Sequence, residues 1–368
     1  MIPYTPLEIA KLSPAAQKAL GPGPGRMMAS RGMMPLPPAD QLAVLYQLSI
    51  DGDASLSEAA KKTAAGLPEK LLAGSLSDGA LDHRVLDFFG MMHVDKAAIF
   101  DAVVQNPQVS DQTIGSLAGK ADSRGTDMIA TNEQRLLRYP EIIAAMYMNR
   151  RARMSTIDRV VELAVRNHVR VPGIAAWDEV ARALTGQTLS GQDDAMFAAM
   201  AEAASGDDSK FTVGDAEQVL PEEELNKLPE GELDQPSIRS LPIPSKIRLA
   251  QVGNAFARGE LIRDPLKIVA VAAIKSPGVT EIEAARYAGN QALPEDVIRY
   301  IAQKREWTRL YGIKMSLCRN PKAPIAETAR FLPFLREKDL TLLAKSKGVP
   351  SALVAQCRKL LMQRGGKK

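Results

Sequence analysis

The chain has 368 residues and a formal net charge of +4, with 45% hydrophobic and 5% aromatic residues. This length can bury a sizeable core, and its abundant Ala, Leu, Ile, Val and Met favour helices over sandwiches or barrels. The two isolated cysteines, Cys318 and Cys357, do not indicate a disulfide framework and are ordinary in a reducing compartment; they could form a bridge only if the fold brought them together.

Neither the N-terminal residues nor the apolar runs indicate a membrane-directed segment. The first residues lack a basic stretch followed by an apolar core, so we expect no signal peptide. The apolar stretch 266–274 is interrupted by Lys267 and is too short to span a bilayer. We therefore expect a cytoplasmic protein without a transmembrane segment.

Residues 1–37 are predicted to be a flexible arm. Proline and glycine crowd residues 21–25 and 35–38, and such runs hold neither a helix nor a strand ladder. Helices are expected from Pro38 onward, where apolar residues follow at helical spacing. A turn is expected at residues 51–53.

A helix–turn–helix frame recurs along the chain. In three turns a polar residue and a proline follow an amphipathic helix, at Asn106-Pro107, Ser276-Pro277 and Asn320-Pro321. A fourth turn, beginning at Asn149, has the same frame without the proline. Proline cannot continue the preceding helix, and Asn tolerates the conformation that ends one.

Capping residues are predicted for the helices that follow these turns. Ser110 can cap one of them. Thr280 with Glu283, and Ser155 with Asp158, have the spacing of a capping box, in which each side chain bonds the other residue's backbone N–H.

The frame recurs at a period typical of helical arrays. Asn106 and Asn149 are 43 residues apart, and Pro277 and Pro321 are 44 apart. HEAT and armadillo repeats have periods of about 40–47 residues. The fold class predicted is therefore all-α, a HEAT/armadillo-like α-solenoid whose units bury one another's apolar faces.

Two stretches carry a resemblance to known families. The sequence from Leu42 through residues 51–55 to Glu69 is similar to the sequences of HEAT-like repeats. The C-terminal half resembles an uncharacterised bacterial family, through 246–250, Gly253-Asn254, 262–265, 305–307, 320–322 and 343–347. The resemblance implies helical repeats but no known activity, so no functional residue is carried over.

Charge divides the chain. Residues 192–235 carry 13 acidic and 2 basic residues, whereas residues 246–368 carry 24 basic and 10 acidic ones. We predict an N-terminal array at 38–186, an acidic linker at 187–245, a basic C-terminal array at 246–364 and a tail at 365–368. One hypothesis is that the acidic segment folds onto the basic array and occupies its surface until a ligand displaces it.

No constellation of residues indicates catalysis. The histidines, His83, His93 and His168, lack zinc-ligand spacing, and residues 21–25 lack the Lys-Ser/Thr of a phosphate-binding loop. No turn presents a nucleophilic serine, and carboxylate pairs lie in the acidic stretch. We predict no metal, no cofactor and no enzymatic activity.

The basic C-terminal array supplies the candidate site, a surface for an anionic partner. Its proposed residues are Lys246, Arg248, Arg258, Arg263, Arg309, Lys314, Arg319, Lys322, Lys345 and Lys347. Lys314 falls within an apolar helix face, where it either meets a groove or extends past apolar neighbours to water.

Three functions are compatible with such a surface. We expect first a non-enzymatic helical-repeat scaffold or adaptor that binds a protein partner. The alternative is sequence-independent binding of nucleic acid through the basic array, for which the few aromatic residues disfavour single-strand stacking. A third option is peripheral contact with anionic lipid.

Overall fold

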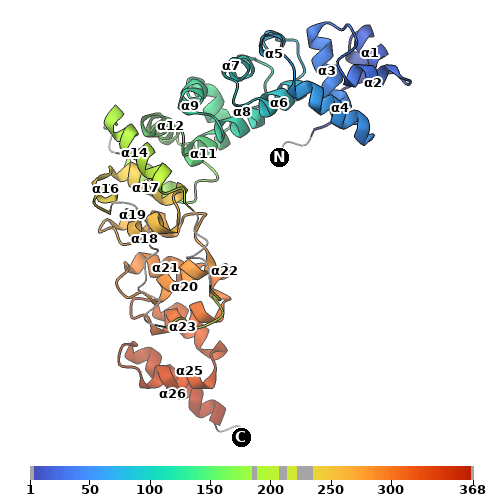
Figure 1. Cartoon of the computed structure of the whole chain (residues 1–368). Helices are drawn as coiled ribbons and strands as arrows, with labels where there is room; N and C mark the ends of the chain where they lie inside the picture. The colour runs from blue at the N-terminus through green and yellow to red at the C-terminus, as the bar shows by residue number, and fades with distance from the viewer. Residues whose placement is uncertain (1–3, 185–188, 207–213, 222–234, 366–368) are drawn as a thin grey trace. The chain divides into compact units, whose positions relative to one another are not determined.

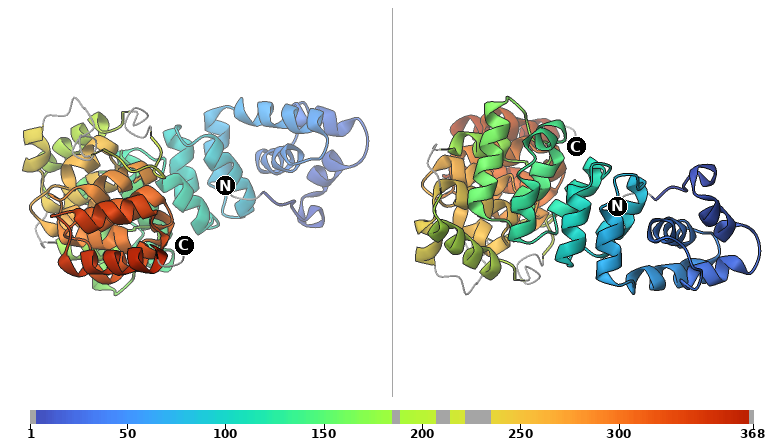
Figure 2. Two further views of the ribbon diagram at one scale, coloured as in Figure 1. Left: turned by 90° about the horizontal axis from the view of Figure 1, so that it is seen from below. Right: turned by 90° about the horizontal axis from the view of Figure 1, so that it is seen from above.

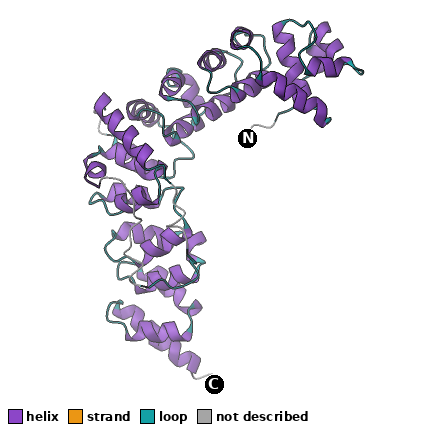
Figure 3. Cartoon of the chain, viewed as in Figure 1, coloured by secondary structure: helices purple, strands orange, loops and turns teal. Residues whose placement is uncertain are grey.

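The computed structural model describes residues 4–184, 189–206, 214–221 and 235–365. Within these ranges every regular element is a helix and none is a strand (Figure 3), which confirms the all-α prediction. Over the same residues, no helix combines the length and the apolarity that a bilayer crossing demands. Residues 185–188, 207–213 and 222–234 of the predicted linker, and 366–368 of the tail, lie outside the described residues.

The contacts divide the chain into two compact units, Met1–Gly173 and Ile174–Lys368. The sequence placed the division later, within 187–245. The difference comes from helix α13 (Trp177–Ala183), which packs against helices of the second unit. Its buried Glu179 lies 2.9 Å from Lys275 Nζ, so an ion pair anchors α13 there.

Unit 1 is a succession of short helices that follow one another in chain order in Figure 1 and Figure 2. Its elements are η1 (Ile9–Lys11), α1 (Pro14–Leu20), α2 (Gly25–Ser30), α3 (Pro38–Ser49), α4 (Ala54–Ala65), α5 (Glu69–Leu76), α6 (His83–Met92), α7 (Ala97–Gln105), α8 (Asp111–Ala118), α9 (Ser123–Ile129), α10 (Glu133–Arg138), α11 (Glu141–Met148) and α12 (Met154–Arg166).

The predicted arm, residues 1–37, is helical in part, contrary to the expectation. Helices α1 and α2 lie within it and pack against α3 and α4. Pro14 occupies the first turn of α1, where its missing N–H costs nothing, and Ser13 caps the helix by accepting from Ala16 N. Arg26 pairs with Asp51, which ties α2 to the turn after α3.

Unit 2 contains the other helices of the residues that the structure describes. They are α13, α14 (Gly191–Ala203), α16 (Gln235–Ser240), α17 (Ile243–Val252), α18 (Ala255–Leu261), α19 (Lys267–Ile274), α20 (Glu281–Gly289), α21 (Glu295–Gln303), α22 (Arg305–Thr308), α23 (Tyr311–Arg319), α24 (Ile325–Phe331), η2 (Leu332–Phe334), α25 (Glu337–Lys345) and α26 (Ser351–Gly365). Helix α14 therefore occupies part of the predicted linker, and it packs against α17.

The recurrent turns share one set of hydrogen bonds. After α7, the buried Asn106 donates from Nδ2 to Leu76 O (2.7 Å) and Asp78 O (2.9 Å), at the C-terminal end of α5. Its Oδ1 accepts from Gln108 N, two residues on (2.9 Å). One side chain thus shapes its own turn and satisfies carbonyls about thirty residues earlier.

The same bonds join other helix pairs. Asn149, after α11, donates to Ala118 O and Ala121 O near the end of α8, both at 2.8 Å. Asn320, after α23, donates to Ala288 O (2.9 Å) and Asn290 O (3.3 Å) near the end of α20. These asparagines have extended backbones and not the left-handed conformation that ends many helices.

Two of the three predicted caps are confirmed. Ser110 accepts from Thr113 N, and Thr280 with Glu283 forms a complete capping box. The box predicted for Ser155 and Asp158 was wrong, because α12 begins at Met154 and places Ser155 inside the helix.

Candidate functional site

The basic residues proposed from the sequence do not form one surface. Arg248 is fully buried beneath Phe197, with its Cζ 4.5 Å from the ring centroid. Arg258 is 3% exposed and bonds Glu283 through two of its nitrogens. Lys246 is also buried, with its Nζ 3.0 Å from Asp264 Oδ2. Arg248 and Arg258 thus belong to the interior of unit 2, whereas the paired Lys246 lines a 610 Å³ pocket together with Arg263.

The other proposed residues are spread over several helices and turns, with Lys314 and Arg319 both on α23. Arg309 is exposed and lies 3.1 Å from Glu281, while Lys314 donates to Arg309 O and lies over the Phe334 ring. Lys314 thus bonds a backbone carbonyl beside an aromatic ring. The exposed residues Arg263, Lys322, Lys345 and Lys347, with the half-buried Arg319, complete the set.

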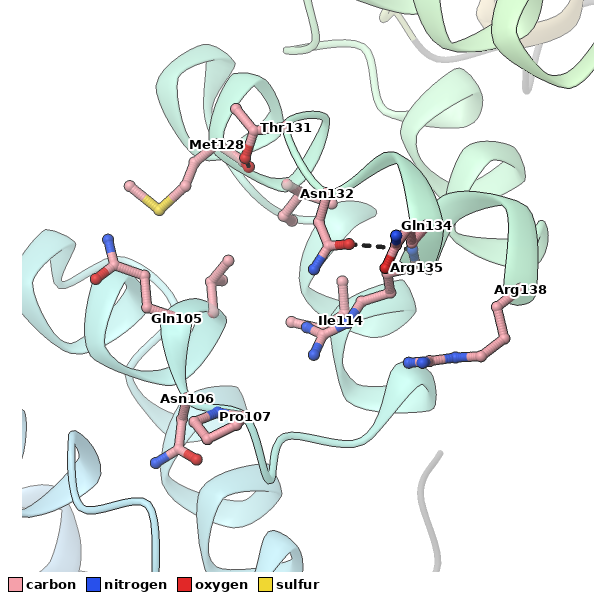
Figure 4. A pocket seen from close by; sticks show the side chains of 12 residues that line it. Gln105, Asn106, Pro107, Ile114, Met128, Thr131, Asn132, Gln134, Arg135 and Arg138 are labelled. Carbon is pink, nitrogen blue, oxygen red and sulfur yellow. Dashed lines mark hydrogen bonds between the residues drawn. The ribbon is translucent and has the colours of Figure 1, made fainter.

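A pocket in unit 1 brings together a different group of residues. It has a volume of 540 Å³ and lies between the end of α7, the middle of α8 and the α9–α10 segment (Figure 4). Its lining is Val104, Gln105, Asn106, Pro107, Ile114, Met128, Ile129, Thr131, Asn132, Gln134, Arg135 and Arg138. Its lining combines apolar side chains with amides and two arginines, which supply its polar groups.

Arg135 is the distinctive group of this pocket. Its side chain is 12% exposed, and in Figure 4 it extends from α10 toward the centre of the pocket. Its Nε lies 3.3 Å from Asp111 Oδ1 without making a hydrogen bond, and that nitrogen is shielded from solvent. A guanidinium that is mostly buried and incompletely hydrogen-bonded retains donors for a ligand.

The charges around Arg135 are not balanced. Asp111 is already held by Arg138, whose Nε (2.8 Å) and Nη2 (2.6 Å) bond its two oxygens. Burial lowers the pKa of Arg135, the Asp111 carboxylate opposes that shift, and the charge of Arg138 adds to it. One carboxylate thus faces two guanidiniums, and a second anion would stabilise the charged form of Arg135.

The local sequence explains how Arg135 reaches the pocket. Asn132 caps the short helix α10 by accepting from Arg135 N at 3.1 Å, which fixes the turn that carries the arginine. Gln105 and Gln134 are exposed at the rim, where their amides can both donate and accept. No local pattern in the sequence marks this site, because residues 1–191 are neutral overall and only folding removes most of Arg135 from solvent.

Over the described residues, no group of three or more His, Cys, Asp or Glu side chains is arranged to hold a metal ion. No family model, no curated protein and no solved structure matches the chain. The site is therefore interpreted from its own geometry.

Proposed function

We propose that this chain is a HEAT-like α-solenoid scaffold that binds a carboxylate of a partner protein in the Arg135 pocket. The carboxylate is either an Asp or Glu side chain or a chain terminus, since both present the same two oxygens. The observation that carries the proposal is the mostly buried, incompletely bonded guanidinium of Arg135 in a 540 Å³ pocket.

The repeated asparagine turns support the solenoid. Asn106, Asn149 and Asn320 each tie the end of one helix to the end of the preceding layer, with sequence separations of 28 to 32 residues. Such nearest-layer bonding is typical of helical-repeat proteins. Their surfaces recognise extended segments of other proteins more often than they catalyse reactions.

The chemistry of the pocket favours a carboxylate partner. Arginine presents a planar fork of donors that matches the two oxygens of a carboxylate. The surrounding amides of Gln105, Asn132 and Gln134 suit the alternating donors and acceptors of a peptide main chain. Partial burial strengthens such charge-assisted bonds relative to exposed ones.

Peptide selection against the full chain tests this proposal. A random peptide library is displayed with either free or amidated C-termini, and binders are measured by fluorescence anisotropy. We expect binders that carry Asp, Glu or a free C-terminus, and the amidated arm distinguishes a chain terminus from a side chain. Arg135→Gln should weaken binding by about ten- to a hundredfold, the worth of charge-assisted bonds of about 1.5–3 kcal/mol.

A matched control is available in the same unit. Arg124 also pairs with an aspartate, Asp101, but its side chain is 48% exposed and lies outside the pocket. Arg124→Gln should leave peptide binding unchanged. Peptides that bind the Arg135→Gln variant as tightly as the original chain, or a selection that yields no carboxylate-dependent binder, would refute the proposal.

Nucleic-acid binding remains the alternative proposal for unit 2. Of the ten basic residues proposed from the sequence, three are buried, namely Lys246, Arg248 and Arg258. Seven basic residues are therefore left to contact phosphates. Anisotropy of labelled duplex DNA, single-stranded DNA and RNA, titrated with the full chain at several salt concentrations, separates the two. Log-linear weakening with salt supports the alternative, and no binding at low salt eliminates it.

A further inference from the structure

Residues 214–221, here called the strap, lie against helices α20 and α23 of unit 2. They belong to the acidic stretch 192–235 of the sequence. A Cβ built on Gly214 would lie 3.2 Å from Ile282 Cδ1 on α20, and the buried Ala216 and Leu220 are 6% and 7% exposed. The strap is thus seated on the basic half of the chain and partly buried by it.

Gly312 leaves room for the strap because it has no side chain. A Cβ at this position would lie 2.1 Å from Gln218 O and 2.5 Å from Ala216 O. Both atoms belong to the strap's backbone, so no side-chain rotation could relieve the clash. The first turn of α23 and the strap backbone therefore approach each other at a distance that only glycine allows.

Glu217 caps helix α23 from the strap. Its Oε2 accepts from Tyr311 N at 3.0 Å, at the first residue of this nine-residue helix. Leu310, the N-cap residue, offers no side-chain oxygen of its own. A carboxylate satisfies a free N–H there and interacts favourably with the positive end of the helix dipole.

The strap presents Glu217 in a locally fixed conformation. Asp215 Oδ1 accepts from Glu217 N (2.9 Å), and Asp215 O accepts from Gln218 N (3.0 Å). This single turn points Ala216 into the protein and leaves Asp215 and Glu217 at the surface. The strap therefore has a recognisable sequence pattern. A small residue, Ala216, precedes the glutamate Glu217, and the apolar Leu220 follows three positions after it.

Two cations and one carboxylate lie near the end of α23 that the strap covers. Arg336 lies over the ring of Tyr311, with its Cζ 4.6 Å from the centroid. Lys314, one turn into α23, donates to Arg309 O at 2.9 Å. Asp339 accepts a hydrogen bond from the Tyr311 hydroxyl, which leaves two cations against one carboxylate around this first turn. The excess of positive charge favours an acidic segment, in addition to the helix end.

We infer that this site on α20 and α23 recognises an acidic segment of another protein, and that the strap occupies it in cis. The strap supplies every element of the recognition: the glutamate on Tyr311 N, the backbone against Gly312, and the apolar Ala216 and Leu220. A partner with the same pattern must displace it. The site lies in unit 2 and does not depend on the Arg135 pocket.

The test uses the full chain and a fluorescent peptide with the strap sequence, Gly-Asp-Ala-Glu-Gln-Val-Leu-Pro. Three proteins are compared: the original chain, an opened variant with Glu217→Gln and Leu220→Ser, and the opened variant that also carries Gly312→Ala. The peptide should bind the opened variant, and Gly312→Ala should abolish binding. The original chain should bind at least about tenfold more weakly, because a tethered segment competes at an effective concentration of about 1 mM.

A peptide with Gln in place of its glutamate is the matched control, and it should bind the opened variant several-fold more weakly. Hydrogen exchange provides a second readout that needs no ligand, since Glu217→Gln alone should speed exchange of the Tyr311 amide. Failure of the opened variant to bind, equal binding by the original chain, or equal binding after Gly312→Ala would each overturn the inference. Loss of carboxylate-dependent binding by Arg135→Gln bears on the other site alone.

Discussion

Asn149 Nδ2 donates to Ala118 O at 2.8 Å, although 31 residues separate them in the chain. The carbonyl is one of those that a helix leaves unsatisfied at its C-terminal end. The same nitrogen reaches Ala121 O at 2.8 Å, just beyond the end of α8. One buried amide thus fixes how the ends of α8 and α11 lie together.

Replacing Asn149 by alanine should strongly destabilise this part of unit 1. Two buried carbonyls lose their donor, at about 1–3 kcal/mol each. We expect amide hydrogen exchange in α8 and α11 to accelerate by about a hundredfold, which corresponds to nearly 3 kcal/mol. Asn167→Ala is the control, because Asn167 is exposed and its Nδ2 donates to Leu163 O in the helix that it directly follows. Similar exchange in the two variants would contradict the role of Asn149 in joining α8 to α11.

Asp158 should make the stability of unit 1 depend on pH. Burial, with a smaller contribution from Glu162, raises the pKa of its half-buried carboxyl to about 6. The folded state therefore holds this proton more tightly than the unfolded state, whose carboxyl has a pKa of about 3.9. The protonated form stabilises the fold below pH ~4, and this contribution is lost as pH rises through about 6.

Asp158→Asn should consequently stabilise the chain at pH 7.5 by about 1 kcal/mol, a value reduced for solvent screening, and have little effect at pH 4. Thermal unfolding followed by circular dichroism at both pH values measures the difference. Asp127→Asn should act in the opposite direction at pH 7.5, because Asp127 pairs with Arg153 and accepts from Thr156. Equal effects of Asp158→Asn at the two pH values would refute the raised pKa of the Asp158 carboxyl.

Gly278→Ala should disturb the buried ion pair of unit 2. A Cβ at Gly278 would lie 2.7 Å from Arg258 Nη1. The Arg258 side chain cannot move away freely, because it bonds both carboxylate oxygens of the fully buried Glu283. It also donates to Gly253 O. We expect a loss of about 2 kcal/mol, read from faster hydrogen exchange in α18 and α20. Gly52→Ala, where the added atom meets nothing within 4 Å, should change little.

The cysteine thiols should be unreactive in the folded protein. Burial raises the pKa of Cys318 to about 12 and also raises that of Cys357. At pH 8 the Cys318 thiolate fraction is then about one in ten thousand, so attack on a disulfide reagent is slow. A colorimetric thiol assay should detect these groups only after denaturant is added. Rapid reaction of both thiols without denaturant would contradict this burial.

The local pattern of the sequence was sufficient to predict the all-helical fold, the recurrent turns and two caps. Helix formation, chain reversal at a proline and capping by Ser110 or Thr280 each depend on residues a few positions apart. Such short-range interactions can be recognised from the amino-acid sequence alone. For the same reason the turns at Asn106, Asn149 and Asn320 could be recognised in the sequence. The prediction, however, gave these asparagines a role in ending a helix and not in bonding a distant one.

Tertiary structure alone decided which groups lose contact with water and which distant groups meet. The sequence could not distinguish Arg248, buried beneath Phe197, from the exposed Lys345, because each is a cation in a helical pattern. Nor could it show that Arg135 lines a pocket, or that Glu217 reaches Tyr311 across a separation of 94 residues. Burial and long-range pairing depend on how whole helices pack, and packing sums many weak contacts that no local motif encodes.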